Sequence, residues 1–66
     1  MPTLTVNGIA TNVEASTIAE LVVTLGLAGK RIAIERNGEI VPRSRYAETP
    51  LAPGDRLEIV GAIGGG

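Results

Sequence analysis

The chain has 66 residues, of which 44% are apolar, and Tyr46 is its single aromatic residue. This length falls short of the usual ~100 to 150 residues of one domain, so it excludes a two-domain enzyme and requires one compact aliphatic core. Cysteine and histidine are absent and the formal net charge is −1, which excludes disulfides, thiol or Ser/His catalysis, the usual zinc ligand sets and a broad basic face for nucleic acid.

An alternating apolar pattern surrounds the first Asn-Gly pair, Asn7-Gly8. This dipeptide is typical of a two-residue type I′ hairpin turn, because both residues accept a positive φ. The pattern predicts two antiparallel strands at about residues 3–7 and 8–13, with Val6 opposite Ile9. One face of the hairpin would then carry Leu4, Val6, Ile9, Thr11 and Val13.

The apolar period changes to that of a helix after Ala15. Thr17 and Glu20 form a capping box that predicts a helix start. Gly26 is expected to end the helix in a Schellman motif, with Leu27 folding back toward Val22. Between these signals, apolar residues recur at i, i+3, i+4 and i+7, namely Ile18, Leu21, Val22 and Leu25. A helix of about nine residues is marginal alone, so we expect it to cross the apolar face of the hairpin.

A second Asn-Gly pair, Asn37-Gly38, separates two further short strands. The first covers Arg31 to Arg36 and the second covers Glu39 to Val41. Pro42 is predicted to end the second strand, because proline has no N–H to donate. The following segment, residues 43–51, is interpreted as a connection with one helical turn. Ile32 and Ile34 are expected to point inward.

The last predicted strand, Arg56–Val60, follows a turn at Pro53-Gly54-Asp55 and directs Leu57 and Ile59 inward. A hairpin, one crossing helix and a later set of strands on a single core is the order of a β-grasp domain. Because crossover connections are right-handed, we expect the last strand to lie beside the first and parallel to it. The sequence therefore predicts an α+β fold over residues 1–60, with a mixed four- to five-stranded sheet and one main helix across one face.

Residues 61–66 read Gly-Ala-Ile-Gly-Gly-Gly. We expect a flexible tail here, because glycine has no Cβ to restrain the backbone. Six extended residues at ~3.3 to 3.6 Å each reach about 20 Å, enough to enter the cleft of another protein. The group delivered would be the α-carboxylate of Gly66, which is ionised at pH 7 and is a weak nucleophile toward an activated phosphate. The alternative is a frayed end without a reactive role.

Three stretches carry a resemblance to a known family: Glu35–Arg43 with the sequence ERNGEIVPR, Gly54–Val60 with the sequence GDRLEIV, and the Gly65-Gly66 end. With these motifs, the whole chain resembles the ThiS family, the sulfur carrier proteins of thiamine biosynthesis. Tyr46 stands where the family often has tryptophan, which is a conservative difference outside the tail.

The resemblance implies a ubiquitin-like carrier that is a cosubstrate and not an enzyme, with no catalytic residue, cofactor or metal of its own. A ThiF-type adenylating enzyme, using ATP and magnesium, would join the Gly66 carboxylate to AMP. A persulfide sulfur donor would then displace AMP to give a thiocarboxylate, from which a ThiG-type thiazole synthase would take the sulfur. Gly64 and Gly65 would give access to the partner's active site. Ala62 and Ile63 would contact the partner's channel or cover the end of the core.

Two alternative functions share this reading of the fold. The small subunit of molybdopterin synthase also ends in Gly-Gly and forms a thiocarboxylate, although members of that family tend to be longer. A non-covalent β-grasp interaction module would have an inert tail. An independent enzyme is disfavoured, because a pair of catalytic carboxylates needs a cleft that raises one pKa, and a core of this size offers little concave space.

Two surface features indicate where partners could bind. Ala10, Ala33 and Val60 face outward on the open side of the sheet, either as a docking surface or as ordinary half-buried positions. Residues 30–45 carry five basic and two acidic side chains, either as solvated surface or as a docking patch for an acidic partner. With no leader and no apolar run of about 18 residues, we expect a cytoplasmic protein that binds neither membrane nor nucleic acid.

Overall fold

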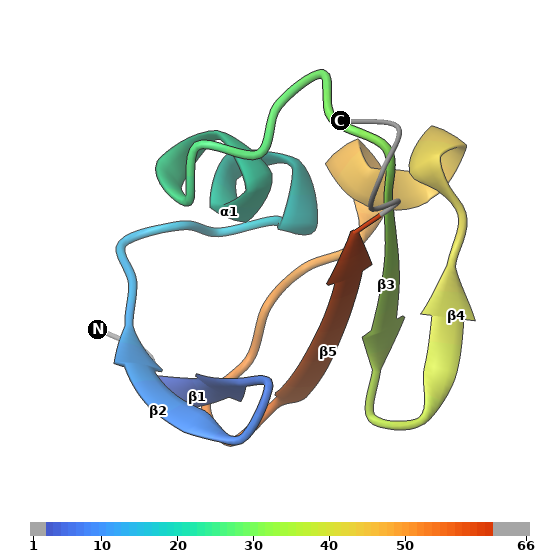
Figure 1. Ribbon diagram of the computed structural model, residues 1–66. Coiled ribbons are helices and arrows are strands. Elements are labelled where there is room, and N and C mark those ends of the chain that lie inside the picture. Colours follow the sequence, from blue (N-terminus) through green and yellow to red (C-terminus); the bar gives the residue numbers. More distant parts are fainter. Residues whose placement is uncertain (1–2, 62–66) are drawn as a thin grey trace.

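Residues 3–61 are described by a computed structural model, in which a five-stranded sheet carries one α-helix across one face (Figure 1). The strands are β1 (Thr3–Val6), β2 (Ile9–Asn12), β3 (Ile32–Arg36), β4 (Glu39–Val41) and β5 (Arg56–Gly61). The helices are α1 (Ile18–Thr24) and a 3₁₀-helix, η1 (Arg43–Glu48). The spatial order is β2-β1-β5-β3-β4, with β1 and β5 parallel and the other pairs antiparallel. The predicted β-grasp order and the central parallel pair are confirmed.

Both Asn-Gly pairs form the predicted turns. The φ angles are 53° and 83° at Asn7 and Gly8, and 53° and 89° at Asn37 and Gly38, which is the positive-φ pair of a type I′ turn. Val6 pairs with Ile9 across the first turn, as predicted from the alternation. β4 ends at Val41, immediately before Pro42.

Ile9 departs from the prediction, since its side chain is 70% exposed although Leu4 and Val13 are buried. Ile9 directly follows the turn and lies on β2, which is an edge strand with one neighbouring strand only. A side chain in this position receives little cover from the sheet. The expected five-residue apolar face is therefore buried at Leu4 and Val13 and open at Ile9.

The ends of α1 follow the predicted capping signals, with one difference at the start. The Glu20 N–H donates to Thr17 Oγ1 at 3.3 Å, whereas Glu20 Oε1 accepts from the Ser16 N–H at 2.7 Å instead of from the N-cap residue. At the other end, Gly26 has a φ of 74°. The Leu27 N–H donates to Val22 O at 2.8 Å and the Gly26 N–H to Val23 O at 3.0 Å, which is the complete Schellman pattern. The helix has seven residues, against about nine predicted.

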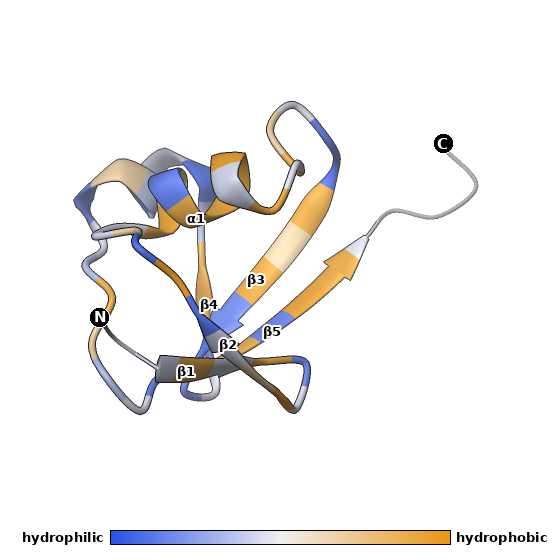
Figure 2. Cartoon of the chain, turned by 90° about the vertical axis from the view of Figure 1, so that its left-hand side faces the viewer, coloured by the Kyte–Doolittle hydropathy of each residue, from blue (hydrophilic) through white to orange (hydrophobic). Residues whose placement is uncertain are grey.

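The core lies between α1 and the sheet, which Figure 2 shows as two layers with hydrophobic stretches along β3 and β5. It consists of two clusters that α1 spans. One contains Leu4, Val13, Ala15, Leu21 and Leu57, and the other contains Ile18, Val22, Ile34 and Tyr46. Burying one such aliphatic side chain contributes roughly 1.5 to 3 kcal/mol. Among residues 3–61, no helix has the length and apolar character needed to cross a membrane.

Candidate functional site

The residues predicted to carry or deliver the chemistry lie outside the described part of the chain. They are Gly64, Gly65 and Gly66, together with the predicted contact residues Ala62 and Ile63. The description ends at Gly61, which is the last residue of β5 and pairs with Ile32. β5 thus runs one residue beyond the predicted end at Val60. The candidate site that can be built from the structure is the base from which residues 62–66 continue.

β5 holds this base in the middle of the sheet, between β1 and β3. Both turn asparagines fix the strand with their side chains. Asn7 Oδ1 accepts from the Ile59 N–H at 2.7 Å, and its Nδ2 donates to Ile59 O at 3.1 Å. Asn37 Oδ1 accepts from the Arg56 N–H at 2.9 Å. Each asparagine therefore has two roles: its positive φ forms the turn, and its side-chain amide binds the backbone of β5.

Asp55, directly before β5, is the one buried charged residue among residues 3–61, with 5% of its surface exposed. Its carboxylate accepts hydrogen bonds from Arg36 Nε at 2.9 Å, Asn37 Nδ2 at 3.1 Å and the Ala52 N–H at 2.8 Å. Burial acts to raise the pKa of Asp55, but the hydrogen bonds from Ala52, Asn37 and Arg36 and the Arg36 charge hold this pKa below its ordinary value of 3.8. Asp55 is consequently ionised at neutral pH, and its hydrogen bonds hold the start of β5 against β3 and the turn at Asn37.

The sequence had explained Asp55 only as a turn residue. Its partners Arg36 and Asn37 lie 19 and 18 positions away, so local pattern does not reveal them. The antiparallel pairing of β3 and β5 brings the last turn next to the second Asn-Gly pair. With this pairing known, an acidic residue in that turn and a basic residue beside the Asn-Gly pair would have indicated the contact.

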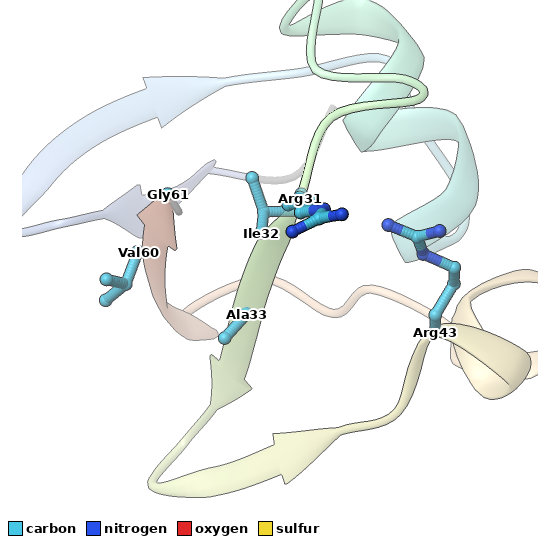
Figure 3. Close-up of a pocket in the computed structure, with 6 residues that line it drawn as sticks. All are labelled: Arg31, Ile32, Ala33, Arg43, Val60 and Gly61. Atoms are coloured by element: carbon cyan, nitrogen blue, oxygen red, sulfur yellow. The ribbon is translucent and has the colours of Figure 1, made fainter. Parts of the chain in front are cut away.

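A hollow of about 450 Å³ lies beside Gly61, at the other end of β5. Six residues line it, namely Arg31, Ile32, Ala33, Arg43, Val60 and Gly61. In Figure 3, the guanidinium groups of Arg31 and Arg43 point toward one another across the same open space. Arg43 is anchored, because its Nη2 donates to the Lys30 carbonyl at 3.1 Å. No carboxylate lines this space among residues 3–61. We call it the Gly61 hollow.

The outward residues predicted as a docking surface divide into two places. Ala33 and Val60 pair across β3 and β5 and both line the Gly61 hollow. Ala10 is also exposed, but it lies on β2, two strands away from β5. Val60 is 63% exposed, so the alternative of a half-buried sheet position is wrong for this residue. The apolar surface nearest the chain end therefore adjoins Arg31 and Arg43.

The described residues provide a hydrogen-bonded base for residues 62–66 and, beside it, the Gly61 hollow. Among residues 3–61, no group of three or more metal-ligating side chains occurs. A Cβ added at Gly61 would meet no atom within 4 Å, so the folded body does not require glycine at this position for steric reasons. The predicted reacting group, the carboxylate of Gly66, lies outside the described residues.

The model of the ThiS family matches residues 4–66 of the chain. The chain is 48% identical over 64 residues to a thiazole synthase of Paramagnetospirillum magneticum and 43% identical over 61 residues to one of Magnetococcus marinus. These matches cover 96% and 91% of the chain but only 20% and 19% of the two relatives, so the chain spans about a fifth of their length. It is also 40% identical over 53 residues to the sulfur carrier protein ThiS of Bacillus subtilis, with 80% of each covered.

Two solved structures share the fold. The crystal structure of the thiamine biosynthesis protein ThiS from Geobacter metallireducens superposes with a TM-score of 0.81 at 32% identity, covering 97% of this chain and 99% of that one. The solution structure of a thiamine biosynthesis protein from the same organism gives a TM-score of 0.78 at 32% identity, covering 97% and 87%. The likeness therefore extends over nearly the full length of both chains.

Proposed function

The chain belongs to the ThiS family of sulfur carriers in thiamine biosynthesis, and from this premise we propose that the carboxylate of Gly66 is the group that bears the sulfur. The observation that carries the proposal is the family match, which continues to residue 66 and so includes the closing glycines. Cysteine is absent from the sequence, so a thiol cannot hold the sulfur. β5 lies in the middle of the sheet, so the residues after it extend from a well-held strand. This supports the proposal that they deliver the carboxylate to a partner enzyme.

The proposed chemistry proceeds in two stages on partner enzymes. On a ThiF-type adenylating enzyme, the Gly66 carboxylate attacks the α-phosphorus of magnesium-bound ATP, and pyrophosphate leaves. The product is an acyl adenylate, a mixed anhydride with a good leaving group. The terminal sulfur of a persulfide donor then attacks the carbonyl carbon and AMP leaves. A thiol must reduce the resulting S–S bond to release the thiocarboxylate.

A thiazole synthase is the proposed acceptor of the sulfur. Two curated thiazole synthases contain a segment similar to this chain within a polypeptide about five times as long. A carrier and the enzyme that consumes its sulfur work in sequence, which gives a physical reason for joining them, because a tether raises their effective concentration. The fusion therefore supports a ThiG-type partner for this chain.

Gly64 and Gly65 are proposed to let the chain end enter a narrow active site, and Ala62 and Ile63 to contact the walls of that channel. Extended at ~3.3 Å per residue, residues 62–66 span about 17 Å beyond Gly61. The chain supplies the carboxylate in this scheme, and the partner supplies ATP, magnesium and the catalytic groups. The proposed role is that of a cosubstrate.

Intact-protein mass spectrometry tests the proposal. The chain is incubated with ATP, magnesium, the adenylating enzyme and a persulfide source, and the expected product has one oxygen replaced by sulfur, mapped by fragmentation to Gly66. The same spectra show whether Gly66 ends the polypeptide, as the chemistry requires. No sulfur gain, with an enzyme that is active on a control carrier, would refute the proposal and favour an interaction module with an inert tail.

The matched family and relatives favour the thiamine branch over the small subunit of molybdopterin synthase. The two branches use the same carrier chemistry, so the mass measurement does not separate them. Transfer assays do: the thiocarboxylate form should lose its sulfur to a thiazole synthase and retain it with the large subunit of molybdopterin synthase.

A further inference from the structure

The basic side chains of residues 30–45 divide into two groups in the structure. Arg36 pairs with Asp55 at 2.9 Å, and Arg45 approaches Glu48 at 3.7 Å. For Lys30, Arg31 and Arg43, no ion pair joins the side chain to a carboxylate among residues 3–61. Two of these side chains lie together, because Arg31 and Arg43 both line the Gly61 hollow. Two positive charges without a carboxylate partner among residues 3–61 therefore lie beside the end of β5, in a chain whose net charge is −1.

The arrangement is suited to an anionic group of fixed position. A guanidinium has five N–H donors in a planar fork, and Arg43 uses one nitrogen on the Lys30 carbonyl, which leaves donors directed to the open side. Arg31 points toward the same space (Figure 3). Two like charges facing one shared space repel each other. A carboxylate placed between them would relieve this repulsion and gain charge-assisted hydrogen bonds.

The surface beside the arginines is apolar. Ile32, Ala33 and Val60 line the same hollow, and Val60 is 63% exposed. A ligand that fits both features has carboxylates beside an apolar side chain. This combination is common at the edge of a protein–protein interface, where apolar contacts are surrounded by polar ones.

We propose that Arg31 and Arg43 dock an acidic rim of the adenylating enzyme, around the opening that receives residues 62–66, while an apolar side chain of that enzyme rests on Ala33 and Val60. The inference rests on the proposed function, since it needs a partner that accepts the chain end. Charge complementarity identifies the occupant as an acidic protein surface.

The nucleotide is not the anion in question. Gly61 lines the hollow, and in the proposed function the phosphates of ATP react at the Gly66 carboxylate, five residues further along the chain, which can reach about 17 Å from Gly61 when extended. Arg31 and Arg43 should therefore act on docking and not on the chemical step. Charges at the rim of an interface change the association rate and its salt dependence.

The test is ATP–pyrophosphate exchange catalysed by the purified ThiF-type enzyme of the same organism, measured against carrier concentration. Combining Arg31→Glu with Arg43→Glu should raise the half-saturating carrier concentration about tenfold at about 50 mM NaCl, with the maximal rate and the KM for ATP unchanged. At about 0.5 M NaCl the difference should shrink to about twofold, because salt screens exposed charges.

Arg56→Glu is the matched control for Arg31→Glu, because each variant changes the net charge by −2 and Arg56 is an exposed residue at the opposite end of β5. It should shift the half-saturating concentration by less than about twofold. Arg31→Glu alone keeps the test valid if loss of the Arg43 bond to Lys30 lowers stability, which thermal melting detects. Arg31→Glu is expected to give about half of the double variant's effect on a logarithmic scale.

Four results would overturn the inference: an unchanged half-saturating concentration, an equal shift in Arg56→Glu, a shift that persists at high salt, or a raised KM for ATP. If these appear while the wild-type chain supports exchange, only the docking inference is lost. A wild-type chain that supports no exchange, with an enzyme active on a control carrier, would instead overturn the proposed function and the inference with it.

Discussion

Arginine side chains lie at both ends of β5, but their surroundings differ. At the start of the strand, Asp55 is buried and binds Arg36, Asn37 and a backbone N–H. At its end, Arg31 and Arg43 face open space without a carboxylate among residues 3–61. The hydrogen bonds of a buried carboxylate hold separate elements of one chain together, whereas exposed cations contribute little to the stability of their own fold. The start of β5 is therefore arranged for stability, whereas its end leaves two arginines available for the docking that we propose.

The largest predicted effect lies beyond the end of the strand. Gly65→Trp should reduce the rate of carrier adenylation by about a hundredfold or more, because a bulky side chain displaces the reacting carboxylate in a narrow channel. Thermal melting should be unchanged, since residue 65 belongs to the predicted tail and not to the predicted domain. Exchange assays and melting curves of the same protein check both statements. Adenylation at the wild-type rate would show that the end of the chain does not enter the enzyme.

The next effect lies at the start of the strand. Asp55→Ala leaves Arg36, Asn37 and the Ala52 N–H without their shared acceptor, and should cost roughly 2 to 3 kcal/mol of unfolding free energy. For a domain of this size, the melting temperature should fall by about 10 to 20 °C. Calorimetry measures the change, with Glu48→Ala as a control, because the Arg45–Glu48 pair is exposed. Equal small losses in both variants would contradict the stabilising role of Asp55.

The pH dependence of stability should report the same carboxylate. Since the pKa of Asp55 is lower in the folded protein than its ordinary value of 3.8, folding favours the ionised form, and this contribution is complete well above pH 3.8. As the pH falls through 3.8 and then through the lower folded value, the contribution is lost. In Asp55→Asn, the melting temperature should therefore fall less than in the wild type as the pH decreases from about 5 to 2. A fall that matches the wild type would show that other carboxylates dominate.

The smallest predicted effect separates the two tasks of a turn asparagine. Asn37→Gly keeps the positive φ but removes the bonds to Asp55 and to the Arg56 N–H, and should cost about 1 kcal/mol. Asn37→Ala removes the same bonds but, unlike glycine, keeps a Cβ at a φ of 53°, so it should cost about 1 kcal/mol more than Asn37→Gly. Urea unfolding of the two variants measures the difference. Identical losses would mean that the conformation of the turn contributes nothing separate.

The elements set by neighbouring residues could be predicted from the sequence. The Asn-Gly turns, the Schellman end at Gly26 and the stop before Pro42 depend on residues within a few positions of one another. The parallel pairing of β1 and β5 needed a rule of chain topology, which held. The prediction for Ile9 was wrong because alternation indicates which face of a strand a side chain occupies but not how much of that face is covered.

The candidate site was predictable in its parts and not in its arrangement. The excess of basic residues in residues 30–45 was visible in the sequence. Which of them form ion pairs was not visible, because Arg36 pairs with Asp55, which lies 19 positions away. Arg31 and Arg43 meet only after β3, β4 and η1 have folded back on one another. The prediction that Gly66 bears the sulfur depends on the resemblance to the ThiS family, because composition and periodicity leave a frayed end as an alternative.

The most direct measurement of the central claim is the intact mass of the protein isolated from its own cells during growth without thiamine. We predict a chain that ends at Gly66 and includes a species with one oxygen replaced by sulfur, which fragmentation places on that residue. The species should decrease when thiamine is supplied. A chain that continues past Gly66, or one that holds only the carboxylate while the cells make thiamine and an added thiocarboxylate standard survives the isolation, would contradict the account.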